Sequence, residues 1–493
     1  MPRLVDSPTP LALGNHVSPA NRLRSRAPIH ALALLIVAGG ACSNAGGAPA
    51  NGATASDSAR HAFVAVDTTR RFQRIVGWEA VAQAAQELPE YPRFRDTLMA
   101  LAADELGLNR IRLEVRSGME SRRDYEAERA TNPDVAKVWA CVRYATENDN
   151  TDPLVIDTGG FKFSGMSRAV EHVVLPLKRR LEARGERLYV NVTYVAFVSK
   201  LCPGYSYHHD DNSEEYAEFA LATFQFLRDR YGLVPDAWEL VLEPDPKIWS
   251  GERLGHALVA TKRRLNANGF FPDFIGPSTV HADMALPMLE QMLRVPGARQ
   301  ALSELSYHRY GALGTRPGEL RAIGQRAAQL GLRTSMLEHI GSDYQNLHAD
   351  LELANVSAWS QYTLAYTGGD NGGHYYRVEL DDGDPRVEIG RRSIFLAQYF
   401  RHIRRDAVRV GVTSENASVH PLAFVNADGS RVVVLKADGP ASVSIGGLPA
   451  GRYAVSATLE RGPRPPSDEV RVTLGQFVNL RIAGRGVLTI AGR

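Results

Sequence analysis

Two glutamates, Glu243 and Glu338, each end a short run that is typical of a buried strand. Residues 239–242 form the first run, which Pro244 terminates, and residues 333–337 form the second. In a β/α barrel the carboxyl end of a strand is where the chemistry takes place. A glycosidase needs two carboxyl groups that face each other across the scissile bond, so the pair predicts hydrolysis of glycosidic bonds. The alternative for the first run is a helix or strand that ends in an ordinary surface Glu-Pro, and the second run favours the catalytic interpretation.

Strand-like runs alternate with helical segments between residues 61 and 405, the part of the chain that must position the two glutamates. This alternation predicts an α/β fold, a (β/α)8 TIM barrel. A doubly wound sheet is the alternative, but no glycine-rich phosphate loop opens a helix. Residues 355–366 fit a helix or a strand, and residues 116–165 and 368–376 are expected to be loops. Strands are expected at 73–79, 108–114, 187–194, 239–242, 274–277, 305–310 and 333–337, and helices at 91–106, 170–183, 214–231, 255–268, 282–293, 320–330 and 393–405.

The pattern changes in residues 406–493. Short alternating segments are separated there by Asp-Gly, Gly-Gly and Pro-Gly turns. This is typical of a small antiparallel β-sandwich domain that follows the barrel. Residues 61–67 form a further single strand, which belongs either to the barrel domain or to the sandwich.

Residues 1–42 are typical of an export signal. Three arginines precede a short apolar run at 31–38, and small residues follow it. The run is too short to span a bilayer comfortably. Cys42 ends a segment that resembles a bacterial lipobox, so a lipid on Cys42 and simple cleavage near Ala41 both stay open. Residues 43–60 are rich in small residues and are expected to form a flexible linker.

The composition excludes several kinds of protein. A net charge of +2 and a hydrophobic fraction of 44% describe an ordinary globular chain with no nucleic-acid-binding surface. Membrane attachment is expected only through a lipid on Cys42, and the protein is expected to be a monomer. Cys141 and Cys202 either pair or stay as two buried thiols. No cysteine and histidine spacing indicates zinc.

Several polar and aromatic residues near predicted strand ends are candidates for substrate contacts. Arginine at a strand end can orient a carboxylate or bind sugar hydroxyls, and aromatic rings stack on the apolar faces of sugars. Each could equally be structural, in an ion pair or a packed core. The candidates are Trp78, Arg112, Asn191, Tyr194, His308, Tyr310, Trp359 and Tyr375.

Four short motifs, in this order, resemble those of clan A glycoside hydrolases, most closely family 30. The resemblance covers residue 62 to the end of the chain. It departs from the clan at Leu242, where an asparagine that bonds the sugar 2-hydroxyl is usual. The motifs are Phe-Gln-Arg-Ile-Val-Gly-Trp at 72–78, Glu-Pro-Asp at 243–245, His-Arg-Tyr-Gly at 308–311 and Leu-Glu-His-Ile-Gly-Ser at 337–342.

The resemblance implies a retaining double displacement on a carbohydrate substrate, without a cofactor or a metal. Glu338 would be the nucleophile and Glu243 the acid and base, with their carboxyl groups about 5–5.5 Å apart. Glu243 would need a raised pKa, supplied by apolar surroundings or by the charge of Glu338. Tyr310 and Arg112 would hold Glu338 in orientation, and Arg112 would keep it ionised.

Two other functions stay open. The first is a carbohydrate-binding protein on the same fold that has lost catalysis, for which Leu242 is the best argument. The second is a metal-dependent barrel hydrolase that uses His281, His308, Glu338 and His339. Successive residues on one strand point to opposite faces, so Glu338 and His339 would not easily ligate one ion.

Overall fold

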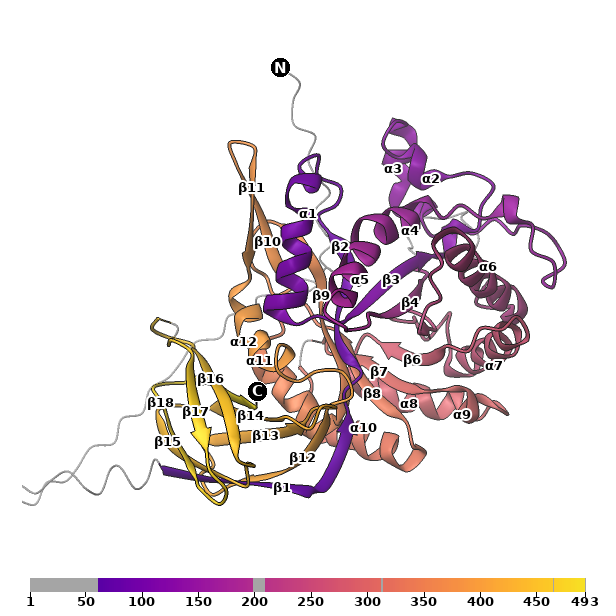
Figure 1. The fold of residues 1–493 in the computed structure, drawn as a ribbon. Coiled ribbons are helices and arrows are strands. Elements are labelled where there is room, and N and C mark those ends of the chain that lie inside the picture. Colours follow the sequence, from indigo (N-terminus) through magenta and orange to yellow (C-terminus); the bar gives the residue numbers. More distant parts are fainter. Residues whose placement is uncertain (1–60, 198–208, 312–313, 464, 493) are drawn as a thin grey trace, which may run out of the picture. The chain divides into compact units, whose positions relative to one another are not determined.

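The computed structural model describes residues 61–197, 209–311, 314–463 and 465–492 (Figure 1). The predicted export signal, the linker and Cys202 therefore lie outside the described residues. Cys141 is disulfide-bonded. Within the described ranges, no helix combines the length and the apolar character that crossing a membrane requires.

A closed barrel of parallel strands forms the larger part of the described chain. Neighbouring strands pair in sequence order, and the ring closes because β9 pairs with both β2 and β8. The TIM barrel predicted from the sequence is confirmed. The eight strands in the described ranges are β2 (Gly77–Ala84), β3 (Arg110–Arg116), β4 (Tyr189–Val195), β5 (Ala237–Glu239), β6 (Asp273–Thr279), β7 (Glu304–His308), β8 (Arg333–Glu338) and β9 (Val356–Thr367).

Local sequence signals explain where the barrel helices begin and end. The side chain of Asn212 accepts hydrogen bonds from the backbone N–H groups of Glu214 and Glu215, which caps α6. Gly232 ends α6 with a left-handed φ of 61°, which glycine adopts without strain. The helices named below are α1 (Tyr91–Ala100), α5 (Leu175–Glu182), α6 (Ser213–Tyr231), α7 (Gly251–Ala267), α8 (Ala282–Met292), α10 (Pro317–Leu330), α11 (Tyr344–Ala349) and α12 (Arg391–Phe400).

Two segments expected to be loops contain regular structure. Residues 116–165 include the short helices α2 (Tyr125–Glu128) and α3 (Pro133–Val142). Residues 368–376 run into a hairpin of β10 (His374–Asp381) and β11 (Asp384–Ile389), and β10 extends the barrel sheet beside β9. The loop prediction was wrong for residues 374–376, which begin β10. The glycines that indicated a loop end at Gly373, just before this strand.

The C-terminal domain is a nine-stranded sheet of the described residues, and it includes the first strand of the chain. β1 (His61–Arg74), indigo in Figure 1, lies along the later strands and pairs with β12 and β15. Strands from both halves of the sheet share one apolar core. The later strands are β12 (Val408–Ser414), β13 (Val419–Val425), β14 (Arg431–Ala437), β15 (Ala441–Gly446), β16 (Gly451–Leu459), β17 (Asp468–Val472), β18 (Val478–Ile482) and β19 (Gly486–Gly492).

Buried charges fill part of the barrel interior. The Arg110 guanidinium lies between two carboxylates, 2.5 Å from Glu79 Oε2 and 3.1 Å from Glu304 Oε1, and all three side chains are fully buried. Burial raises the pKa of Glu79, whereas at Glu304 the effect of burial is outweighed by Arg110 and Arg333, which lower the pKa. Each charge in this layer is tolerated because its partners compensate it.

This compensation predicts the effect of Glu304→Gln on stability. Removing one carboxylate leaves the Arg110 charge partly uncompensated, so the free energy of unfolding should fall by about 3–5 kcal/mol. Urea unfolding measures the loss. The matched control is Glu388→Gln, which removes a carboxylate from an exposed pair with Arg377 and should change stability by less than about 1 kcal/mol. Equal effects of the two substitutions would contradict the compensation.

Candidate active site

Glu243 lies just beyond β5 on a backbone that few residues adopt. Its φ is +48°, in the left-handed region, which costs a residue other than glycine about 1–3 kcal/mol. Hydrogen bonds to the neighbouring strands hold this conformation. The Leu242 N–H donates to the Tyr194 carbonyl at 2.9 Å, and the Glu243 N–H donates to the Ser278 carbonyl at 3.1 Å. The strained turn aims the carboxyl group at the mouth of the barrel.

Glu338 is the last residue of β8 and is held on both oxygens. Arg112, which projects from β3 into the barrel, donates to Oε2 in a very short contact, and the Tyr310 hydroxyl donates to Oε1 at 3.0 Å. The Tyr310 hydroxyl itself accepts from the Ile340 N–H at 3.2 Å. Both donors favour the ionised form of Glu338 and fix its orientation.

The two glutamates and His308 meet in one place. His308, the last residue of β7, shares a hydrogen bond of 2.8 Å between its Nδ1 and Glu243 Oε1. One potential ligand atom of each of the three residues lies within 4.8 Å of those of the other two. The side chains of Glu243 and Glu338 are 12% and 9% exposed, so the pair is nearly withdrawn from water.

The surroundings give the two carboxyl groups different protonation. Burial raises the pKa of Glu243 to about 7, against the opposing charges of Arg112 and His281. Burial also raises the pKa of Glu338, but Arg112 is in direct contact there and opposes it. Burial lowers the pKa of His308 to about 4, so its ring is neutral at pH 7. Of the two carboxyl groups, Glu338 alone has a cationic donor, which favours the negative charge of the pair on that residue.

Of the predicted substrate contacts, Arg112, His308 and Tyr310 lie at the glutamate pair, and Asn191 lies below it. The Asn191 side chain donates to Glu239 Oε2 at 2.9 Å inside the barrel and is fully buried. Arg112 lies 3.9 Å from the same glutamate. The Asn191 side chain thus belongs to the buried charge network, and its contact with a sugar stays a prediction.

Trp78 and Trp359 were also predicted to contact the sugar, and the structure does not bring them to the glutamate pair. Both side chains are fully buried on the outer face of the barrel wall. Trp78 stacks on Phe400 of α12 with ring centroids 4.4 Å apart and donates to the Ile403 carbonyl at 2.7 Å. Trp359, its register partner on β9, donates to Asp350 at 3.0 Å. Their strand positions face the helices instead of the barrel mouth.

Tyr194 and Tyr375 are fully buried as well and are not at the glutamate pair. The Tyr194 hydroxyl shares a hydrogen bond of 2.7 Å with His209 Nδ1, and its ring packs among aromatic residues of α6. The Tyr375 hydroxyl donates to the Glu79 carbonyl at 2.8 Å. Both were predicted as sugar contacts, but their hydroxyl groups tie barrel strands to neighbouring segments.

Three residues near the pair were not predicted as site residues of the glycosidase. Glu239 was treated as part of an apolar run, although a charge inside such a run is itself a signal. His281 Nδ1 bonds the Tyr310 carbonyl at 2.6 Å and so braces that tyrosine. Tyr362 feels the charges of Glu338 and Glu114, and burial raises its pKa. The sequence could not orient Tyr362 because residues 355–366 fitted either a helix or a strand.

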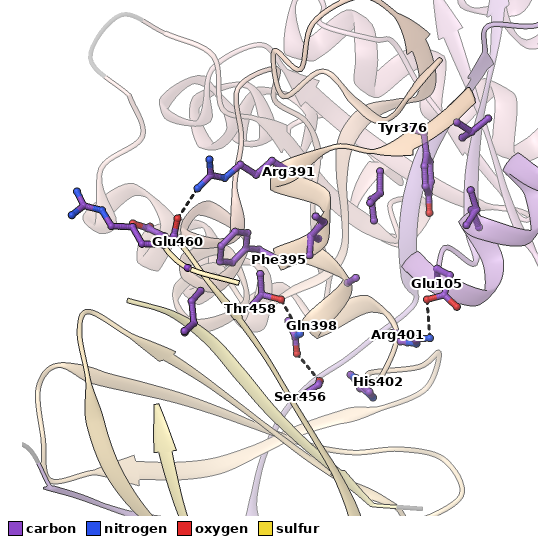
Figure 2. A pocket seen from close by; sticks show the side chains of 18 residues that line it. Glu105, Tyr376, Arg391, Phe395, Gln398, Arg401, His402, Ser456, Thr458 and Glu460 are labelled. Atoms are coloured by element: carbon purple, nitrogen blue, oxygen red, sulfur yellow. Dashed lines mark hydrogen bonds and ion pairs between the residues drawn. The ribbon is translucent and has the colours of Figure 1, made fainter. Parts of the chain in front are cut away.

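A separate groove lies where α12 meets the C-terminal sheet. Its volume is 760 Å³, and Figure 2 shows Gln398 at its floor, bonded to Thr458 at 3.0 Å and to Ser456 at 2.9 Å. Tyr376 and Arg391 also line it. Neither Glu243 nor Glu338 borders this groove, so it is distinct from the candidate active site.

Comparison with known proteins confirms the resemblance noted in the sequence. Residues 406–448 match the model of the glycosyl hydrolase family 30 beta sandwich domain. The catalytic domain of the GH30 xylanase C from Talaromyces cellulolyticus is similar, with a TM-score of 0.61 and 15% identity over 87% of this chain and 100% of that one. The chain has the fold of glycoside hydrolase family 30.

Two further solved structures share this fold. An endo-β1,6-glucanase is similar with a TM-score of 0.60 and 13% identity, over 87% of this chain and 94% of that one. A conserved exported protein from Bacteroides fragilis has a TM-score of 0.61 and 11% identity, over 87% and 100% of the two chains. Named members with this fold thus include enzymes that act on different polysaccharides.

The raised pKa of Glu243 predicts a pH-dependent stability difference. The pKa is about 7 in the folded protein and about 4.5 in the unfolded chain. The stabilising contribution of the neutral carboxyl is therefore complete below pH 4.5 and is lost as the pH rises through 7. Glu243→Gln stays neutral, so at pH 8 it should be more stable than the wild type by roughly 2 kcal/mol, with little difference at pH 4.5. Urea unfolding at both pH values measures the difference in free energy of unfolding between the variant and the wild type. The same difference at pH 4.5 and at pH 8 would contradict the prediction.

Proposed function

We propose that this protein is a retaining β-glycosidase that hydrolyses oligo- or polysaccharides. The observation that carries the proposal is the contrast within the carboxyl pair. One member is held as an anion by Arg112 and Tyr310, and the other has a pKa of about 7 beside a neutral histidine. One oxygen of each carboxyl group lies within 4.8 Å of one of the other, which supports the close spacing of a retaining enzyme over the wider spacing of an inverting one.

In the first step, the Glu338 carboxylate attacks the anomeric carbon and forms a glycosyl ester. The bond to the leaving oxygen breaks, and the protonated Glu243 transfers its proton to that oxygen. Glu243 is then a carboxylate. In the second step it takes a proton from water as the water oxygen attacks the anomeric carbon, which releases the sugar and restores both glutamates.

His308 and Tyr310 have supporting roles in this mechanism. Because His308 is neutral, its bond to Glu243 fits either protonation state of that carboxyl group, as an acceptor or as a donor after tautomer exchange. Glu338 loses its negative charge when it forms the ester, which weakens its hydrogen bond with Tyr310. The Tyr310 hydroxyl still keeps the Ile340 N–H as a second hydrogen-bond partner. Arg112 holds Glu338 in position for the attack.

A carbohydrate-binding protein without catalysis is the alternative, and Leu242 is the observation that favours it. This apolar side chain replaces the asparagine whose contact with the sugar 2-hydroxyl strengthens in the transition state. The elaborate support of Glu338 argues for catalysis, because binding alone gives no reason to hold a buried anion on both oxygens.

A metal-dependent hydrolase is less well supported by the geometry. Glu243, His308 and Glu338 could approach one ion, but Arg112 already compensates Glu338 at that position. A metal ion there would be repelled by the positive charge of the Arg112 guanidinium. Of the other two histidines considered from the sequence, His281 is engaged with the Tyr310 carbonyl. Activity that a chelator does not change would exclude a metal at this site.

We also infer that the protein is exported and is a monomer. Catalysis takes place in the barrel, and the sheet domain follows it from residue 406. The export signal in residues 1–42 is the basis, and the similarity to a conserved exported protein agrees with it. A lipid on Cys42 would anchor the chain at a membrane surface. Mass spectrometry of the mature N-terminus distinguishes the lipid from simple cleavage.

Substitution of each glutamate tests the assignment of roles. Glu338→Gln should lose at least about a thousandfold in kcat on every glycoside, because no nucleophile remains. Glu243→Gln should lose as much on natural polysaccharides but far less on dinitrophenyl glycosides, whose leaving group needs no proton. A panel of aryl β-glycosides, xylans, glucans and galactans provides the substrates. Equal losses for both variants on both substrate types would contradict the roles.

The pH dependence of the wild type tests the acid directly. Because Glu243 must be protonated in the free enzyme, kcat/KM should fall above a pKa of about 7. The alkaline limb should disappear in Glu243→Gln assayed with dinitrophenyl glycosides. A limb that persists unchanged in that variant would assign it to another group.

A further inference from the structure

A second group of acidic side chains lies away from the candidate active site. Glu120 and Asp149 lie in the long segment between β3 and α5, and Glu215 and Glu218 lie in the first turns of α6. Their exposed fractions are 2%, 2%, 6% and 1%. Four carboxyl groups so deeply buried require compensation, because carboxylates are seldom buried without partners.

The carboxyl oxygens of this acidic cluster converge. One oxygen each of Glu120, Asp149 and Glu215 lies within 4.8 Å of the other two. That span is twice a Ca²⁺–oxygen distance of about 2.4 Å, so one ion could contact all three. Glu218 lies one helical turn from Glu215, and it feels the charges of Asp149 and Glu215.

Two buried side chains in the cluster have oxygens with no hydrogen-bond partner among the described residues. Asp149 Oδ1 is one, and both oxygens of Glu218 are the others. Glu218 Oε1 has an ion pair with Arg264 at 3.6 Å, while Arg264 also donates to the Pro153 carbonyl. Among the described residues, this one arginine does not compensate four carboxyl groups.

We propose that Glu120, Asp149, Glu215 and Glu218 form a binding site for a hard divalent cation of the size of Ca²⁺. The donors are all carboxylate oxygens, which suit Ca²⁺ in the flexible geometry that it accepts. His209 is not a free ligand, because Tyr194 bonds its Nδ1 at 2.7 Å and Glu120 bonds its Nε2 at 2.5 Å. This disfavours Zn²⁺, which prefers nitrogen and sulfur.

A cation here would join parts of the chain that are distant in sequence. It would tie Glu120 and Asp149 of the long β3–α5 segment to the first turns of α6. Through Glu120 and His209, the site also reaches Tyr194, whose carbonyl accepts from the residue before Glu243. The proposal does not depend on the hydrolase activity, because a structural ion would stabilise the protein in either case.

Titration calorimetry of the chelator-treated full chain with CaCl₂ tests the site. Ca²⁺ should bind with a stoichiometry of one ion per chain. At a hundredfold excess over Kd, the thermal midpoint should rise by about 3–5 °C. Absence of binding would overturn the proposal, as would MgCl₂ binding with equal affinity.

Variants locate the bound ion. Asp149→Asn and Glu218→Gln should each weaken Ca²⁺ binding at least about tenfold and reduce the rise in the thermal midpoint. Glu388→Gln removes the same charge from the exposed β11 and should bind Ca²⁺ as the wild type does. Unchanged affinity in the two cluster variants would place the ion elsewhere. If either variant fails to fold, the comparison of CaCl₂ with MgCl₂ on the wild type still decides the outcome.

Discussion

The contact between Arg112 and Glu338 is the interaction on which the candidate site depends. A guanidinium that is fully buried in a barrel must be compensated, and here Glu338 and Glu239 share that task. The same contact favours the ionised form of Glu338, against the effect of burial, and fixes its direction. A second buried layer, Arg110 between Glu79 and Glu304, lies deeper in the barrel and repeats the arrangement without reaching the mouth.

Glu243 differs from Glu338 through what surrounds it. Its nearest hydrogen-bond partner is a neutral histidine, and its backbone is held in a left-handed turn by two neighbouring strands. Burial without a cationic donor favours the protonated form. One carboxyl group with a guanidinium and one without it thus lie close together in surroundings that favour different protonation states, as the proposed acid and nucleophile require.

The sequence predicted the barrel and the end of β8 at Glu338, because an apolar run that stops at a carboxylate marks the end of a buried strand. The other run was less well placed, since β5 ends at Glu239, four residues before Glu243. Of the predicted sugar contacts, Arg112, His308 and Tyr310 lie at the glutamate pair, whereas Trp78, Trp359, Tyr194 and Tyr375 do not. An aromatic residue near a strand end can face the mouth or the surrounding helices, and a shift of one residue along the strand decides between them. Composition cannot show that shift, and a tertiary partner such as Phe400 lies far away in the sequence.

The charge difference between the two glutamates can be measured without a substrate. Carbon NMR of protein labelled at the glutamate carboxyl carbon, with Glu243→Gln and Glu338→Gln for assignment, follows both groups through pH. The account predicts that Glu243 titrates with a pKa of about 7 while Glu338 stays ionised across that transition. Titration of Glu338 near pH 7 with Glu243 already ionised would contradict it.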